Sequence, residues 1–169
     1  MKANNRLYHI ILFLSVVLAQ VFIFDKLLIL NNVVPYVYPL FIILQPPHAN
    51  RIQTLILAFL LGLSIDIFQN TGGMHATASL VIAYFRPQLL HFNFGLSYDY
   101  QTLSINNAVL LKKISYVFLV ILLHHVILFS LEFFNINLWQ LFLEKLIAST
   151  LLSVLVNILI LQLLQKQIK

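Results

Sequence analysis

The charged residue set most deeply within an apolar run of this sequence is Asp66. It follows Arg51 by 15 residues, a rise of roughly 22 Å on an α-helix, which is close to the far boundary of a hydrocarbon core about 30 Å thick. A carboxylate there must face protein or water. It could form a binding or proton site, or it could fix two helices through hydrogen bonds to backbone or to a neighbouring span. We favour the structural role, and we expect Lys26 or His75 as its partner rather than Arg86, which belongs at the opposite end of a span.

A second polar group interrupts the apolar run near residue 125. His124 and His125 are neighbours in sequence, and neighbouring residues on a helix point in different directions, so the pair cannot clamp one metal ion. His125 and Glu132 are seven residues apart and share a face, but a metal site would need further ligands from other spans. Polar packing inside a helix bundle is therefore the favoured interpretation, over a metal site or a proton relay.

No catalytic arrangement accompanies these residues. Serines are scattered among the apolar runs without Ser-His-Asp spacing, and the phosphate-binding pattern G-x-x-x-x-G-K-[ST] is absent. Ser149, Ser153 and Asn157 step by four residues, so we expect one helix face that contacts other spans or a partner helix. The sequence predicts a protein that is not an enzyme and that carries no metal and no cofactor.

The composition indicates a single transmembrane domain over residues 1–169. The chain is 61% hydrophobic and 9% charged, whereas soluble domains carry about 25% charged residues. A soluble fold of this size would lack the charges to cover its surface. There is no cysteine, so disulfides are excluded, and the net charge of +5 comes from scattered basic residues. No basic stripe predicts nucleic-acid binding; the expected surroundings are membrane lipid.

Apolar runs of membrane-spanning length predict an all-α bundle of six transmembrane helices. A span needs about 20 mostly apolar residues. Prolines at positions 35, 39, 46 and 47 crowd the second run, and proline removes a backbone donor, so we expect that helix to be broken, kinked or re-entrant. The expected spans are 7–24, 33–46, 52–69, 74–90, 114–134 and 141–164.

The distribution of basic residues predicts the orientation of the chain. With six spans, both termini lie on one side, and the more basic side is cytoplasmic. The two residues expected on the other side are Lys26 and Lys145. Both termini are therefore expected in the cytoplasm, and the first apolar run is expected to be an uncleaved span. The eight basic residues expected on the cytoplasmic side are Lys2, Arg6, Arg51, Arg86, Lys112, Lys113, Lys166 and Lys169.

Small residues at regular spacing predict that the third and fourth spans form a close antiparallel hairpin. Ala58, Gly62 and Asp66 recur every four residues and share one helix face. Small side chains let helix backbones approach closely in lipid. The intervening stretch ends in Gly72-Gly73 and is typical of a tight turn. The matching face of the next helix is expected to carry Gly72, Ala76, Ser79 and Ala83.

This hairpin resembles the signature of the MreD family of rod shape-determining proteins. The segments that carry the resemblance are Phe59–Phe68, with a glycine and an aspartate four residues later, Gly72–Ala76, and Ile82–Pro87, which contains Tyr84 and Arg86. The size, the number of expected spans and the basic bias fit the same family. Within the motif, Gly62, Asp66, Gly72 and Tyr84 match the family pattern.

The resemblance implies a non-catalytic subunit of the bacterial cell-elongation machinery in the inner membrane. Such a subunit would bind MreC, a single-span protein with a periplasmic coiled coil, and would work beside MreB, RodA and a penicillin-binding transpeptidase. It would help to direct lateral peptidoglycan synthesis. The family fold is similar to the substrate-binding component of energy-coupling-factor vitamin transporters, although fold similarity does not carry vitamin binding with it. The alternative expectation is a small-solute-binding component of such a transporter.

Overall fold

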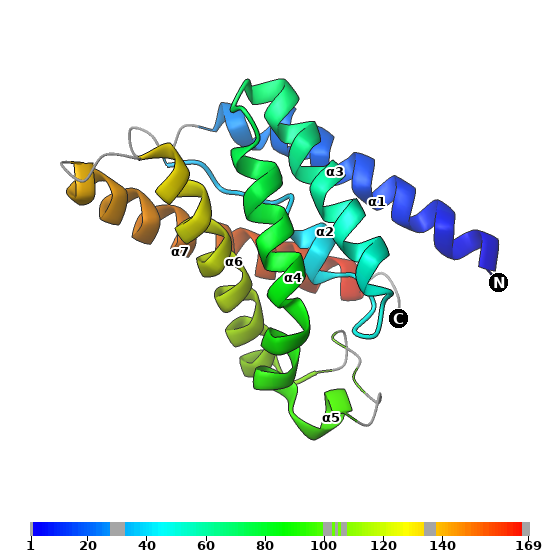
Figure 1. Cartoon of the computed structure of the whole chain (residues 1–169). Helices are drawn as coiled ribbons and strands as arrows, with labels where there is room; N and C mark the ends of the chain where they lie inside the picture. Colours follow the sequence, from blue (N-terminus) through cyan, green and yellow to red (C-terminus); the bar gives the residue numbers. More distant parts are fainter. Residues whose placement is uncertain are drawn as a thin grey trace.

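The computed structural model describes residues 2–27, 33–99, 103, 105, 108–133 and 138–166, and in this part of the chain it is all-helical, without a strand (Figure 1). The predicted fold class is thus confirmed in its coarse form. Lys169 lies outside the described residues, as do the side chains of Lys2, Arg6 and Lys166. The helices are α1 (Lys2–Phe22), the 3-10 helix η1 (Phe24–Lys26), α2 (Leu40–Ile43), α3 (Arg51–Gln69), α4 (Met74–Phe94), α5 (Leu96–Asp99), α6 (Leu110–Glu132) and α7 (Trp139–Lys166).

Four of the described helices are long and apolar enough to cross a membrane, so the expected count of six spans is not confirmed. The four qualifying segments are Leu7–Lys26, Arg51–Gln69, Leu110–Glu132 and Trp139–Leu164. The expected span over 74–90 falls on α4, which has 21 residues. Polar residues interspersed in its second half, including Arg86, Gln88 and Asn93, make it less apolar, and it is not among the four qualifying helices.

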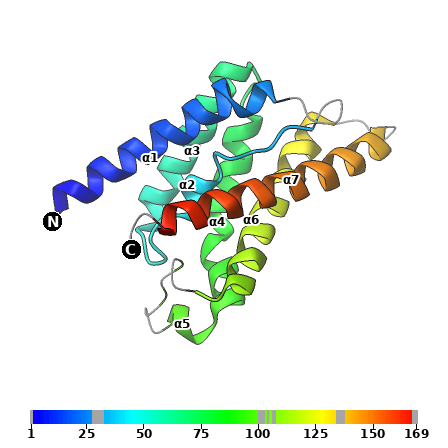
Figure 2. The same ribbon diagram turned by 180° about the vertical axis from the view of Figure 1, so that it is seen from behind.

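The expected span over 33–46 is not a continuous helix. Only the four residues of α2 are helical, and residues 34–37 carry no regular secondary structure. Proline explains this, because the residue before a proline is pushed out of the helical region; Pro35 lies within the extended part, and Pro39 is the N-cap of α2. The expectation of a broken helix holds. Most of the break is a nearly straight segment, residues 33–38, which passes between α1 and α7 and is called the crossing segment below (Figure 2).

This segment must carry the chain back through the molecule, because α1 and α3 run in the same direction. Their C-terminal ends lie side by side: the rings of Phe22 and Phe68 are 6.3 Å apart, and Gln69 Nε2 donates to Asp25 Oδ2 at 2.6 Å. Irregular backbone at membrane depth is tolerated only where protein surrounds it. In agreement, residues 35–43 are buried throughout.

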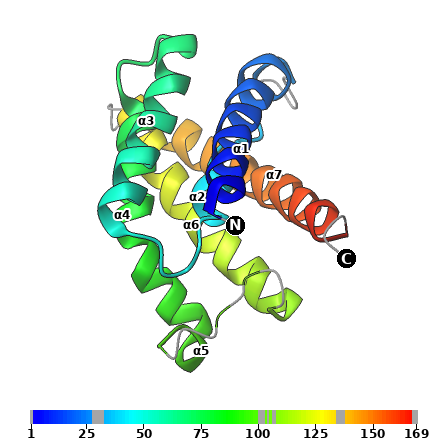
Figure 3. The same cartoon turned by 90° about the vertical axis from the view of Figure 1, so that its right-hand side faces the viewer.

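The hairpin of α3 and α4 forms one side of the molecule, with α1 and α7 on the other (Figure 3). Asn50 caps the N-terminus of α3: its side-chain oxygen accepts from the backbone N–H groups of Ile52 at 3.0 Å and Gln53 at 3.2 Å. Further along the chain, α4 packs on α6, and α6 packs on α7.

The helix ends gather at two ends of the molecule. Figures 1 and 2 show the end of α1, the turn between α3 and α4, and the C-terminal end of α6 toward one end. The loop over 44–50 and helix α5 lie toward the other end. Large apolar side chains on the outside of α1, including Leu14, Leu18 and Phe22, are exposed, as is typical of a surface solvated by lipid.

Candidate functional site: the polar interior

Polar side chains from α1 and α7 bind the backbone of the crossing segment. Gln20 Oε1 accepts from Val37 N at 2.7 Å, and Gln20 Nε2 donates to the carbonyl of Pro35 at 3.3 Å. On the α7 side, the Ser153 hydroxyl accepts from Tyr36 N at 2.9 Å, while Asn157 Nδ2 donates to Tyr36 O at 2.9 Å. These contacts replace the backbone partners that a helix would have supplied, and they remove the several kcal/mol that each orphaned polar group costs in lipid.

The same segment carries a tyrosine hydroxyl that joins two histidines. The Tyr38 hydroxyl lies 2.9 Å from His75 Nδ1 on α4 and 2.5 Å from His124 Nε2 on α6. All three side chains are buried, with Tyr38 and His124 fully so. Because a hydroxyl can donate one hydrogen bond and accept another, one ring nitrogen accepts from it and the other donates to it. Tyr38 therefore ties the crossing segment to two helices at once.

His125 belongs to a neighbouring contact between α6 and α7. Its Nδ1 lies 2.9 Å from the hydroxyl of Thr150, and its ring stacks on Phe129 with centroids 5.2 Å apart. The ring of Tyr36 lies across it at 5.1 Å. The structure thus places the two histidines in polar packing within the bundle, which is the use favoured from the sequence.

Glu132, which the spacing of seven places on the same helix face as His125, has a lysine as its partner. Its carboxylate accepts from Lys145 Nζ at 2.5 Å, and this pair ties the end of α6 to the start of α7. Both side chains are partly exposed, 35% for Glu132 and 19% for Lys145. The carboxylate thus lies at the partly exposed end of α6, whereas His125, two turns earlier in the helix, is fully buried.

On α7, the face predicted to contact other spans is fully buried. Ser149, Ser153 and Asn157 each have no exposed surface. The partner of Ser153 and Asn157 is the crossing segment rather than another helix. Eight side-chain polar atoms in the described part of the chain are buried without a hydrogen-bond partner, and they include His124 Nδ1, His125 Nε2, Ser149 Oγ and Asn157 Oδ1.

Asp66 is buried at the end of α3 and binds the first turn of α4. Its Oδ1 accepts from the Thr71 hydroxyl at 2.5 Å and from His75 N at 3.0 Å, and its Oδ2 accepts from Ala76 N at 2.8 Å. Of the two expected partners, His75 is confirmed, through its backbone N–H rather than its ring, whereas Lys26 forms no ion pair with Asp66 among the described residues. The free N–H groups at a helix start attract a carboxylate, so Asp66 binds backbone. This is the structural role that the sequence favoured.

Gly62 lies where the two helices of the hairpin touch. A Cβ built on this residue would lie 2.5 Å from Ala76 Cα, which no real side chain allows. Ala58, one turn earlier, is fully buried, and so is Ala76 apart from 2% of its surface. Closeness of the backbones therefore requires glycine at position 62 and small residues around it.

The turn between the helices uses residues that tolerate positive φ. Asn70, Gly72 and Gly73 have φ of 56°, 62° and 97°, the left-handed region that glycine and asparagine adopt at low cost. Gly72 had been expected on the face of the following helix. It lies in the turn instead, because α4 begins at Met74; Ala76, Ser79 and Ala83 do lie on the buried face.

The two remaining hairpin residues have different surroundings. Tyr84 is half exposed, with the guanidinium of Arg51 4.6 Å from its ring centre. Arg86 is almost fully buried, and its guanidinium donates to the carbonyl oxygens of Gln45 and Pro46, the latter at 3.1 Å. Arg86 therefore holds the loop after α2 to α4.

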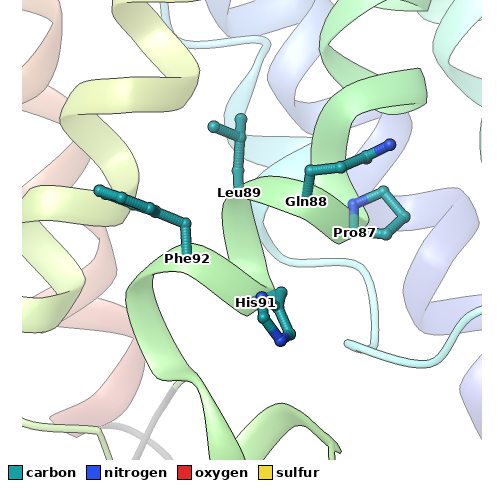
Figure 4. A pocket seen from close by; sticks show the side chains of 5 residues that line it. All are labelled: Pro87, Gln88, Leu89, His91 and Phe92. Atoms are coloured by element: carbon teal, nitrogen blue, oxygen red, sulfur yellow. The ribbon is translucent and has the colours of Figure 1, made fainter.

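Two hollows on the surface differ in what they offer a ligand. The larger, about 710 Å³, is lined only by residues of α4, whose side chains point in different directions (Figure 4). The second, about 340 Å³, lies at the ends of α1 and α3 and includes Asp25, Lys26 and Tyr36. Among the described residues, no group of three histidine, aspartate or glutamate side chains could hold a metal ion. The lining of the larger hollow is Pro87, Gln88, Leu89, His91 and Phe92.

Sequence reasoning missed Gln20 and the tyrosines of the crossing segment. A glutamine in a first span carries no spacing signal, and the roles of Tyr36 and Tyr38 depend on a path of the chain that proline content alone did not show. No protein-family model, no curated protein and no solved structure matches this chain.

Proposed function

We propose that this chain is a non-catalytic membrane scaffold of the bacterial cell-elongation machinery, similar to MreD, that binds the single-span protein MreC. One observation carries the proposal. Two of the residues that carry the resemblance to that family hold the α3–α4 hairpin together: Gly62 allows the backbones to touch, and Asp66 accepts hydrogen bonds from the first turn of α4. Because these motif residues also form a packed contact between two helices, they support the family resemblance better than the sequence pattern does by itself.

A scaffold needs a rigid interior and free outer faces. The interior is tied by side-chain bonds between α1, α7 and the crossing segment. In contrast, only 17% of the first apolar span is buried within the chain. This leaves a long apolar surface for lipid or for the span of a partner. In the proposed complex, MreC uses such a surface, and MreB, RodA and a penicillin-binding transpeptidase complete the assembly.

The proposed orientation has both termini in the cytoplasm of a bacterial inner membrane. It rests on the bias of Lys and Arg in the sequence. The grouping of the 44–50 loop and α5 at one end of the molecule is compatible with it. In this orientation the α3–α4 turn and the Glu132–Lys145 pair lie on the periplasmic side, where the coiled coil of MreC begins.

Solute binding in the interior is the weaker alternative. A transporter component would use its buried polar groups for a substrate, but here Gln20, Ser153 and Asn157 bind the chain's own backbone. The Tyr38 hydroxyl is shared by two histidines. Apart from Asn157 Oδ1, these groups are therefore occupied in the folded chain.

The test is affinity purification of the tagged chain from its own membranes, combined with depletion in growing cells. We expect a single-span protein with a periplasmic coiled coil to be enriched over an unrelated multi-span control, and we expect depleted rods to become round. Unchanged rod growth together with the absence of such a partner would contradict the proposal. Stabilisation of the purified chain by thiamine, riboflavin or biotin would favour the alternative.

A further inference from the structure

The smaller hollow has the features of a built site. It has a volume of about 340 Å³ and lies where α1 and α3 end, within the range of about 300–1,000 Å³ that small-ligand sites occupy. Its lining combines a carboxylate, an ammonium group and a phenol with apolar side chains. The lining residues are Val21, Asp25, Lys26, Val34, Tyr36, Phe68 and Gln69.

Two amides hold the Asp25 carboxylate in place. Gln20 Nε2 donates to Oδ1 at 2.7 Å, and Gln69 Nε2 donates to Oδ2 at 2.6 Å. Both donors are neutral, so the negative charge is oriented but not neutralised. No ion pair involves Asp25 within the described residues, and an ionised carboxylate offers about four acceptor positions. The remaining positions are available to a ligand that donates hydrogen bonds and carries positive charge.

Lys26 brings the opposite charge to the same hollow. Its side chain is exposed, and it follows Asp25 directly in the 3-10 helix. A carboxylate and an ammonium group in one hollow match a ligand that has both charges, a primary ammonium and an anion. Charge matching of this kind selects a zwitterion over an ion of either sign.

The position of the hollow points to a lipid as the source of that zwitterion. The spans Leu7–Lys26 and Arg51–Gln69 both end there, which is the level of lipid headgroups. Directly beside it, the rings of Phe22 and Phe68 meet at 6.3 Å and remain 63% and 57% exposed. This aromatic pair forms an apolar surface along which acyl chains can lie.

We propose that this hollow binds the phosphoethanolamine headgroup of a membrane lipid. The primary ammonium donates to Asp25, the phosphate contacts Lys26, and the acyl chains lie against Phe22 and Phe68. A choline headgroup has no N–H to donate, and a glycerol headgroup has no cation, so both should bind less well. This site does not depend on the proposed role in cell elongation.

The experiment compares lipids retained by the purified full-length chain. Nanodiscs that contain phosphatidylethanolamine, phosphatidylcholine and phosphatidylglycerol in equal parts supply the lipids, and native mass spectrometry counts those that remain bound. We expect phosphatidylethanolamine to be enriched, with a loss of about tenfold in Asp25→Asn and Lys26→Gln, the ratio that corresponds to 1.4 kcal/mol. Glu144→Gln, which removes an exposed carboxylate at the start of α7, should keep the wild-type enrichment.

Lys26→Gln and a competition with a soluble headgroup distinguish lipid binding from disruption of the fold and from binding of the headgroup alone. Lys26→Gln leaves the Gln20–Asp25–Gln69 contacts untouched, so its effect on lipid retention cannot come from loss of that network. Soluble phosphoethanolamine at millimolar concentration should fail to displace the lipid, because it lacks acyl chains. Equal retention of the ethanolamine and choline lipids, retention unchanged in Lys26→Gln, or full displacement by the soluble compound would each overturn the proposal.

Discussion

Asn157 on α7 donates a hydrogen bond from its side-chain amide to the backbone carbonyl of Tyr36, at 2.9 Å and across 121 positions of sequence. One turn earlier on α7, Ser153 accepts from the N–H of the same Tyr36. A single helix face therefore satisfies both backbone groups of one residue in the crossing segment. Side chains here take over what a neighbouring strand or helical turn does in other folds.

Replacing Asn157 by leucine should destabilise the chain. The change leaves the Tyr36 carbonyl buried without a donor, and an orphaned buried group of this kind costs about 1–3 kcal/mol. Thermal unfolding in detergent, followed by circular dichroism, measures the effect. Gln162→Leu, at an exposed position of the same helix, serves as the control and should leave the unfolding temperature nearly unchanged. An equal loss in both variants would contradict the role of Asn157.

Gln20→Leu should have a larger effect than Asn157→Leu. Gln20 binds four groups: Val37 N, Tyr38 N, Pro35 O and Asp25. Its loss therefore leaves three backbone groups without this partner and removes one of the two amides that bind Asp25. Because Gln20 and Asn157 hold the same segment, the double variant should lose less stability than the sum of the single ones. A double-mutant cycle based on unfolding in detergent measures the coupling, and strict additivity would show that the two side chains act independently.

Gly62→Ala should weaken or prevent closure of the α3–α4 hairpin. The added Cβ meets backbone atoms of His75 and Ala76, and overpacking of this kind costs about 1–3 kcal/mol or more. The yield of monodisperse protein and its unfolding temperature should both fall. Gly72→Asn is the matched control, since no atom lies within 4 Å of its Cβ position and asparagine tolerates the φ of 62°. Normal stability in Gly62→Ala would disprove the close contact.

Asp66→Asn should destabilise the start of α4. Asparagine keeps one acceptor oxygen, but its NH₂ group then faces a backbone N–H, whereas the carboxylate accepts from Thr71, His75 and Ala76. We expect a loss of about 1–3 kcal/mol, and a smaller one in Thr71→Val, which removes a single donor. Hydrogen exchange of the amides of residues 75 and 76, measured by mass spectrometry, should speed up most in Asp66→Asn. Unchanged exchange there would exclude the capping role.

Tyr38→Phe should loosen the contact between the crossing segment and helices α4 and α6. Removing the hydroxyl leaves His75 Nδ1 and His124 Nε2 without their shared partner in a buried site, and the expected loss is about 1–3 kcal/mol. Tyr84→Phe is the control, because that ring is half exposed and keeps its contact with Arg51. The unfolding temperatures of the two variants decide the matter, and equal values would contradict the bridging role.

Local spacing was a good guide wherever a contact lies within one helix pair. The four-residue steps of Ala58, Gly62 and Asp66 predicted the α3–α4 contact, because helix periodicity sets which residues share a face. The face formed by Ser149, Ser153 and Asn157 was likewise predicted to be buried. What it touches was not predictable, since that depends on the path of residues 33–38.

The long-range contacts could not be predicted from the sequence, for a physical reason. Proline at positions 35 and 39 indicates a broken helix, but many broken paths satisfy the same restriction. The choice among them depends on groups such as Gln20 and Tyr38, whose partners lie on other helices. Hydrogen bonds from Asp66 to backbone were expected, but Ala76 as a donor was not predicted, because every residue except proline carries a backbone N–H and no side chain marks the one that is used.

The crossing segment also sets an order of folding during synthesis. Its backbone has few hydrogen bonds of its own, and the side chains that bind Tyr36 belong to α7, which is synthesised after the segment. During synthesis, residues 33–38 therefore lack their hydrogen-bond partners on α7 until that helix has been made. The backbone of Tyr36 is thus satisfied only after α7 has packed against the segment.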